Sequence, residues 1–198
     1  ANIEYEGKGV AWPEFETIVS MGSNLFIDDL DALIKWNLLV NDLGIDIISL
    51  GGNIGCFLEA AERKLLNMDL SELGFKQDSE KSDNYLIWGA TEPIEKLIKM
   101  ITYREGIGND LAEGVQNFCA IRNLPQDLST VGKGLEIPAH EPRSSNLTAL
   151  DYATTSRGAY HCYEPMQLSS GMTLKKELGL TKLVDRFSKE EAVDAVIK

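Results

Sequence analysis

Apolar residues recur every three or four positions along most of this 198-residue chain. Residues spaced i, i+3, i+4 and i+7 share one face of an α-helix, so this spacing predicts helices with one buried side. The clearest stripes cover residues 30–41, 49–66 and 91–105. Strand patterns are confined to Tyr85–Trp88 and Leu135–Ile137. The sequence therefore predicts an all-α, multihelical fold.

Terminal signals mark several of these helices. Asp28 and Asp29 precede the first helix, where carboxylates are favourable, and Gly44 follows it as a C-terminal stop. Thr91 is the expected N-cap of the third helix, with Pro93 in its first turn. The buried stripe of the third helix is expected to be Ile94, Leu97, Ile98 and Ile101. Shorter helices are expected at 111–121, at 146–156 and after the capping box Ser188–Glu191.

Glycines stand in the early turns of the second helix, at Gly51, Gly52 and Gly55. Each costs ~1 kcal/mol relative to alanine inside a helix. We therefore expect another backbone or a ligand to approach this helix closely.

The charge balance excludes two classes of partner. The chain has 19 basic and 31 acidic residues, a formal net charge of −12. Tracking a nucleic-acid backbone needs a basic face, and an anionic membrane surface repels an acidic chain. A membrane span needs ~20 apolar residues, whereas the apolar runs here are only a few residues long. We expect neither a nucleic-acid partner nor a membrane.

Three cysteines, Cys56, Cys119 and Cys162, lie far apart in the sequence, and no C-x-x-C motif is present. This excludes a local zinc or iron–sulfur clip. A sparse, odd number of cysteines is typical of a reducing compartment, so we expect a cytoplasmic protein with buried, free thiols.

Two carboxylates are candidate site residues, and each has a simpler structural explanation. Glu16 follows Trp12 and Phe15, which could remove water from its carboxylate. It also forms a pair with Glu14, two residues earlier, and two carboxylates at this spacing are usually solvated. The segment Asn41–Asp46 is either a left-handed cap with a turn, or a concave loop whose Asp46 accepts hydrogen bonds from a planar, N–H-rich ligand.

The chain has only two histidines, His140 and His161. His140 lies in a stiff loop between prolines, and we expect it to be a surface residue. His161 follows Gly158, which permits a sharp turn that could present the imidazole to a pocket. On spacing alone, a structural role is the commoner one for such a histidine.

Several short blocks stand in order along the chain: Pro13–Thr17, Asn41–Asp46, Arg104–Gly108, Leu111–Gly114, Lys133–Pro138, Pro142–Arg143 and Tyr152–Gly158 with His161. Together they resemble the tungsten-containing aldehyde:ferredoxin oxidoreductase family, whose first block reads P-E-[YF]-E-T. The combination is specific, although no single block is. The resemblance implies the helical domains 2 and 3 of that family, with residues 1–130 similar to domain 2 and residues 131–198 to the beginning of domain 3.

Members of that family hold tungsten or molybdenum between two pterin dithiolenes, and a nearby [4Fe-4S] cluster passes electrons to ferredoxin. The resemblance implies that Asn41, Gly44, Ile45 and Asp46 form one pterin-binding loop. Asn41 departs from the usual aspartate at the first position of that loop.

By the same resemblance, Glu16 and His161 lie near the metal as acid–base groups. Oxidation of an aldehyde to an acid releases protons, and a carboxylate and an imidazole are suitable groups to handle them. No residue of this chain is expected to ligate the metal itself.

The family's C-x-x-C-x-x-x-C cluster motif, its second pterin loop and its β-rich N-terminal domain are not found in this sequence. We therefore expect a fragment of a longer enzyme that oxidises aldehydes with ferredoxin as acceptor, with the remaining domains as its partners. The fragment alone is expected to bind no cofactor and to be inactive. Two alternatives stay open: a benzoyl-CoA-reductase-type tungsten subunit, and a non-catalytic helical module in which Glu16, Asp46 and His161 serve only packing.

Overall fold

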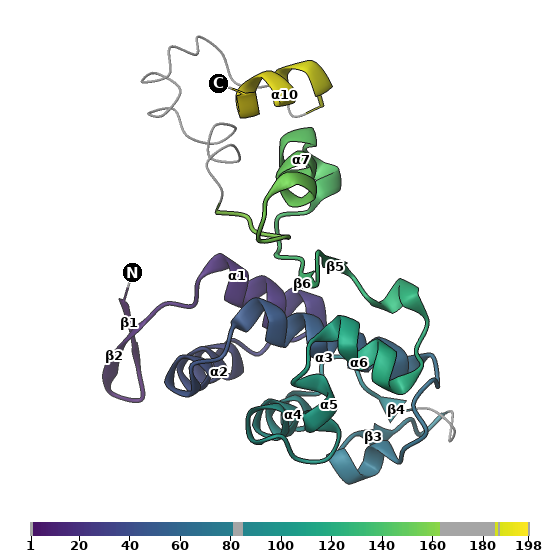
Figure 1. The fold of residues 1–198 in the computed structure, drawn as a ribbon. Coiled ribbons are helices and arrows are strands. Elements are labelled where there is room, and N and C mark those ends of the chain that lie inside the picture. Colours follow the sequence, from purple (N-terminus) through teal and green to yellow (C-terminus); the bar gives the residue numbers. More distant parts are fainter. Residues whose placement is uncertain (1, 81–84, 163–184, 186, 198) are drawn as a thin grey trace. The chain divides into compact units, whose positions relative to one another are not determined.

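The computed structural model describes residues 2–80, 85–162, 185 and 187–197, and it confirms a multihelical fold (Figure 1). The chain divides into two compact units, residues 1–130 and 131–198.

The helical segments of the first unit are α1 (Phe15–Thr17), the π-helical turn η1 (Ile18–Gly22), η2 (Ser23–Leu25), α2 (Leu30–Leu43), α3 (Ile47–Glu62), η3 (Leu70–Leu73), α4 (Thr91–Tyr103), α5 (Ile107–Leu111), α6 (Val115–Arg122) and η4 (Gln126–Leu128). Its strands are β1 (Asn2–Tyr5), β2 (Lys8–Ala11), β3 (Lys76–Gln77) and β4 (Tyr85–Leu86). The second unit contains β5 (Val131–Gly132), β6 (Leu135–Glu136), η5 (Pro142–Ser144), α7 (Asn146–Thr154) and α10 (Lys189–Ile197).

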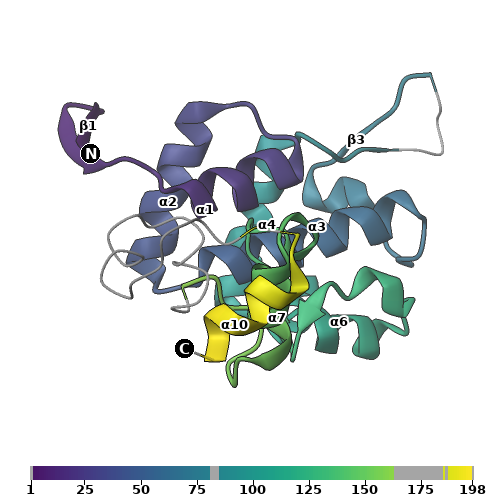
Figure 2. The same ribbon diagram turned by 90° about the horizontal axis from the view of Figure 1, so that it is seen from above.

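Helix α3 is the central element of the first unit. It contacts α1, η1, η2, α4, α5 and α6, and Figure 2 shows it running among them. Its buried side chains are Leu50, Ile54, Phe57 and Leu58. Full burial of such a side chain contributes roughly 1.5–3 kcal/mol, so α3 supplies much of the core that holds the shorter elements.

Two of the glycines in α3 explain how these elements pack. A Cβ atom on Gly51 would lie 2.5 Å from the carbonyl oxygen of Ser20 in η1, and one on Gly55 would lie 2.9 Å from the amide nitrogen of Asn24. The predicted close approach of another backbone is confirmed at Gly51. At Gly55 the neighbour is a flexible side chain.

The ends of α2 and the stripe of α4 follow the prediction. The backbone N–H of Ala32 donates to the Asp29 carboxylate at 3.1 Å, and Gly44 caps the C-terminus with φ of +67°. The predicted stripe of α4, from Ile94 to Ile101, is buried. The predicted cap of α4 is wrong, because Thr91 is already the first helical residue. The backbone N–H of Gly89 donates to the Leu25 carbonyl, and this tertiary bond lies where the chain enters the helix.

The helix predicted over 111–121 corresponds to α6, but Leu111 belongs to α5, a separate helix that was not predicted. Gly114 separates them, with φ of +85° and ψ of +160°. A Cβ on Gly108 in α5 would clash with the backbone of Met100 in α4. Close packing on α4 therefore fixes the course of α5, and the chain must turn before α6 begins.

Each described sheet is a two-stranded antiparallel hairpin. The two predicted strand regions contain β4 and β6, but the β1–β2 hairpin was not predicted. Its register pairs Asn2 with Ala11 and Tyr5 with Lys8. Both turn residues, Glu6 and Gly7, have positive φ, as tight two-residue hairpins require. The dipeptide Glu6-Gly7 was the sequence signal for this turn.

In the second unit, residues 155–161 lie against the β5–β6 hairpin. The backbone N–H of Ala159 donates to the Gly132 carbonyl at 3.2 Å, and the Lys133 ammonium donates to the Thr155 carbonyl at 2.6 Å. A Cβ on Gly158 would overlap the Gly132 carbonyl. The predicted cap of α10 is confirmed, since the backbone N–H of Glu191 donates to the Ser188 hydroxyl.

Among the described helices, none is by itself long and apolar enough to cross a membrane; α2 and α3 reach that length only together, across a 117° bend.

Candidate functional site

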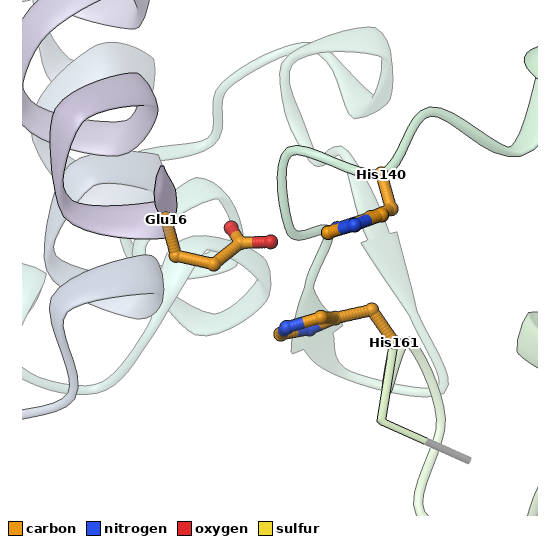
Figure 3. Close-up of side chains that lie close together, drawn as sticks. All are labelled: Glu16, His140 and His161. Atoms are coloured by element: carbon orange, nitrogen blue, oxygen red, sulfur yellow. The ribbon is translucent and has the colours of Figure 1, made fainter. Parts of the chain in front are cut away.

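Glu16 lies in the short helix α1 and its side chain, drawn in Figure 3, is 9% exposed. Its neighbour Thr17 donates from its hydroxyl to the Asn37 side-chain oxygen on α2 at 3.1 Å, and both residues are buried. The π-helical turn η1 follows directly, a conformation often found at functional sites. A bond to α2 and a turn packed on α3 thus hold the backbone around Glu16.

The reason we expected Glu16 to be desolvated is only partly right. Glu16 is buried, but Trp12 and Phe15 are 38% and 59% exposed. Phe15 is therefore largely in solvent and Trp12 partly so, and other residues contribute to the burial of the carboxylate.

The segment Asn41–Asp46 forms the turn between α2 and α3. The backbone N–H of Gly44 donates to the Asn41 carbonyl, and that of Ile45 donates to the Val40 carbonyl. The Asp46 carboxylate accepts from the backbone N–H of Ser49 at 2.8 Å and so caps α3. This is the cap-and-turn geometry expected as the simpler explanation.

The same turn has the features that a planar ligand needs. Nothing lies within 4 Å of the position that a Cβ on Gly44 would take. Asn41 and Asp46 are exposed, and their amide and carboxylate oxygens are acceptors. Structural capping and ligand binding are therefore compatible at this turn.

His161 lies in the second unit and is paired with the other histidine. The rings of His140 and His161 are stacked, with centroids 4.7 Å apart and planes inclined by 11° (Figure 3). Both residues are half-buried. The expectation that His140 is a surface residue is wrong, because the loop that carries it folds back onto the segment that follows α7. The Tyr152 hydroxyl of α7 donates to the His140 carbonyl at 2.8 Å and holds the loop there.

The charged groups beside the histidines are themselves paired. Arg143 forms two hydrogen bonds with the Glu141 carboxylate, both 2.8 Å, and they lower the pKa of Glu141 to about 2. The Arg157 guanidinium lies 4.4 Å from the centre of the Tyr160 ring, which is tilted against His161. Glu141 therefore stays ionised throughout the pH range in which histidines titrate.

The structure also brings two cysteines together. The sulfur atoms of Cys56 on α3 and Cys119 on α6 are 3.7 Å apart, and both residues are buried. Burial raises the pKa of Cys119. Cys162 is exposed, so the expectation of three buried cysteines is wrong for this one, which lies just beyond the part of the chain held by the hairpin.

The predicted site residues fall in both units. Glu16 and the 41–46 turn belong to the first unit, and His161 belongs to the second. Within either unit taken alone, no three His, Cys, Asp or Glu side chains of the described residues lie close enough to hold a metal ion. Sequence reasoning missed His140. The signal for it was that His140 lies between two blocks that carry the family resemblance, Lys133–Pro138 and Pro142–Arg143.

The described residues thus include a buried carboxylate, an imidazole pair and an open glycine turn, which are groups of the kind that proteins use for proton transfer and ligand binding. The family model described as "Aldehyde ferredoxin oxidoreductase, domains 2 & 3" matches residues 1–198. The chain belongs to the aldehyde ferredoxin oxidoreductase family.

Named relatives agree with this assignment. The tungsten-containing aldehyde ferredoxin oxidoreductases of Thermococcus kodakarensis and Pyrococcus furiosus are each 37% identical over 150 residues, 75% of this chain and 23% of the relative. A Pyrococcus furiosus protein named "Aliphatic sulfonate oxidoreductase, WOR-like subunit" is 30% identical over 164 residues, 79% of this chain and 24% of the relative. The chain thus spans about a quarter of the length of the curated relatives it matches.

Proposed function

We propose that this chain is the helical part of a tungsten or molybdenum bis-pterin oxidoreductase that oxidises aldehydes to carboxylic acids and passes electrons to ferredoxin. The observation that carries the proposal is the match of the family model to all 198 residues. Identity to the two aldehyde enzymes, 37%, exceeds the 30% to the sulfonate oxidoreductase subunit, which favours an aldehyde as substrate.

The proposed site uses the α2–α3 turn to hold one pterin. Gly44 leaves room for the ligand to approach the backbone, and Asn41 and Asp46 accept hydrogen bonds from its N–H groups. The dithiolene-bound metal, when present, supplies the two-electron oxidant, with the [4Fe-4S] cluster as the route to ferredoxin.

Proton handling falls to Glu16 and His161 in this proposal. Oxidation of an aldehyde consumes one water and yields the acid, two protons and two electrons. Glu16 is a buried carboxylate, and positioned carboxyl and imidazole groups are the usual acids and bases of such steps.

Two other functions remain as competitors. An acyl-CoA thioester reductase of the same family would bind an acyl-CoA, and a non-catalytic module would use Glu16, Asp46 and His161 for packing alone. Asp46 does cap a helix, so packing alone accounts for one of the three residues.

The test is metal analysis and assay of the native protein purified from its own cells. We expect near-stoichiometric tungsten or molybdenum, iron, and aldehyde-dependent reduction of ferredoxin. The 198-residue chain produced alone is expected to carry neither metal nor activity. A native protein without either metal would overturn the proposal in favour of a non-catalytic module, and acyl-CoA binding without aldehyde oxidation would favour the thioester reductase.

Matched variants of the native protein separate catalysis from folding. We expect Glu16→Gln to lower kcat by about 10²–10⁴, the usual contribution of a positioned acid or base, with the metal content unchanged. Glu14→Gln alters an exposed carboxylate two residues earlier in the same block and should leave kcat unchanged. Equal activity of the two variants would remove Glu16 from the mechanism.

A further inference from the structure

The two histidines of the chain lie closer together than independent titration allows. Their ring centres are 4.7 Å apart, the planes are inclined by 11°, and both residues are half-buried. Two positive charges at this distance repel, and partial burial weakens the screening by water. A neutral ring stacked on a charged one has no such penalty. The arrangement therefore tolerates the first proton and resists the second.

Contacts within the second unit hold the segments that carry the two histidines. His140 is fixed through its carbonyl, which accepts from the Tyr152 hydroxyl at 2.8 Å. His161 follows Gly158 and Ala159, which pack on the Gly132 backbone. Backbone bonds and a tight glycine contact therefore fix the two segments that carry the rings.

We propose that His140 and His161 titrate as one unit that holds a single proton around neutral pH, with His140 as the positioning residue that limits the charge on His161. The titration itself is a property of this chain, and only its catalytic consequence rests on the proposed function. With one proton on the pair, the charge on either imidazole lowers the proton affinity of the other.

Fixed charges nearby do not produce this behaviour. The ionisable groups on the surrounding segments of the second unit are Lys133, Glu136, Glu141, Arg143, Asp151 and Arg157. Tyr160 and Cys162 flank His161 in the sequence. Glu136 and Asp151 are buried, and the reciprocity of the two histidine variants described below separates their titration from that of the pair. Groups that keep one charge state shift both histidines but cannot make one depend on the other. Cys162, with an ordinary thiol pKa of ~8.5, is replaced by serine for the titration.

Nitrogen-15 NMR of the imidazole rings tests the proposal on the 198-residue chain. Only two histidines are present, so the spectrum contains two ring systems. We expect the shifts of each ring to show two inflections with pH, because each ring senses the protonation of the other. Two simple curves, each with one inflection, would overturn the proposal without any histidine variant being made.

Substitution by phenylalanine supplies the second test, since it keeps a stacked ring and removes the charge. In His140→Phe we expect the proton affinity of His161 to rise about tenfold, which is one pKa unit. In His161→Phe the proton affinity of His140 must rise by the same factor, because coupling between two sites is reciprocal. A rise in neither variant, with the amide spectrum unchanged, contradicts the coupling. Asparagine at either position serves if a phenylalanine variant does not fold.

The result of these titrations does not depend on the enzyme activity of the native protein. Coupled titration in a native protein that lacks tungsten and molybdenum would uphold the histidine pair and reject the proposed function. Uncoupled titration in an active metalloenzyme would reject the histidine pair and uphold the proposed function.

Discussion

Asp46 shows how one side chain can serve the fold and a proposed ligand together. One of its carboxylate oxygens accepts the backbone N–H of Ser49 and caps α3. The residue is exposed, and a carboxylate has lone pairs for further donors. Capping at such a position is typically worth about 1 kcal/mol. The cap therefore orients the carboxylate in advance, and a ligand would find the acceptor already in place.

Replacement of Asp46 separates the two roles. We expect Asp46→Ala to lower the free energy of unfolding by about 1 kcal/mol through the lost cap, whereas Asp46→Asn keeps the cap and changes stability little. Urea unfolding measures both. Asp42→Ala, at an exposed position in the last turn of α2, is the control and should stay within about 0.5 kcal/mol of the original chain. Equal stability of Asp46→Ala and Asp42→Ala would show that the cap contributes nothing.

Residues differ in how far the sequence alone can place them. The cap and the left-handed glycine of the α2–α3 turn were predictable because both depend on local backbone geometry. The stacking of His140 on His161 was not, since it joins two irregular segments 21 residues apart with no periodicity between them.

Close packing between elements depends on glycine at two helix crossings. In Gly51 the absence of a side chain lets α3 contact the backbone of η1, and in Gly108 it lets α5 contact α4. A rigid backbone neighbour cannot move aside as a side chain can. These glycines therefore offset their cost in helix propensity through packing.

Gly51→Ala and Gly55→Ala make a matched pair. Alanine is the better helix former by ~1 kcal/mol, yet at Gly51 its Cβ would meet the Ser20 carbonyl. We expect a net loss of about 1–3 kcal/mol at Gly51, the range for overpacking, and a smaller loss or a gain at Gly55, where the amide of Asn24 can rotate away. Unfolding followed by tryptophan fluorescence compares them. A stabilised Gly51→Ala would contradict the close contact.

Helices α2 and α4 are joined by a carboxylate between two lysines. The Glu95 carboxylate accepts from Lys35 of α2 at 2.6 Å and from Lys99 at 2.9 Å. The bond from Lys35, and then that from Lys99, lowers the pKa of Glu95 below its ordinary value. A lowered folded-state pKa gives stability that is present above the ordinary pKa and is lost as pH falls through the folded-state value.

Glu95→Gln should therefore destabilise the chain by up to about 1 kcal/mol near neutral pH, as for a largely solvated ion pair. We expect the difference from the original chain to shrink below pH ~4, where an ordinary glutamate is protonated. Unfolding at a series of pH values, with the exposed Glu105→Gln as control, measures this. A difference that is constant with pH would exclude the ion pairs as its cause.

Among the elements, long helices were predictable and their boundaries less so. The buried stripe of α4 was predicted correctly because four apolar residues fix its period. Its start and the packing of α5 involve contacts with Leu25 and Met100 from other segments, which no local signal encodes. The break before α6 did have a local signal, Gly114, which has positive φ.

At the scale of the whole molecule, the chain is two compact units that carry different parts of the proposed site. Glu16, Asp46 and His161 are separated by 30 and 115 residues of sequence. Their common purpose was inferred from the order of the family blocks, because periodicity and composition give no information on which loops meet. The net charge of −12 argued against nucleic-acid and membrane partners but did not identify a partner.

The first unit should fold without the second. Its core is built around α3, and the three tryptophans, Trp12, Trp36 and Trp88, all lie within residues 1–130. We expect residues 1–130 alone to keep the near-ultraviolet circular dichroism of these tryptophans and to unfold in one cooperative transition. Trp36, which is completely buried, should remain shielded from acrylamide quenching. Loss of that shielding would show that the second unit is needed for the core.

The π-helical turn η1 links the direction of the Glu16 side chain to the length of the chain. Such a turn accommodates one residue more than an α-helix would over the same stretch, and each residue of a helix rotates the chain by about 100°. Deleting one residue between Ile18 and Gly22 would give a regular helix that still follows Ser20 across α3, but it would swing Glu16 about a quarter of a circle or more around the axis. The direction in which this carboxylate points therefore depends on the number of residues in the turn, which substitutions do not change.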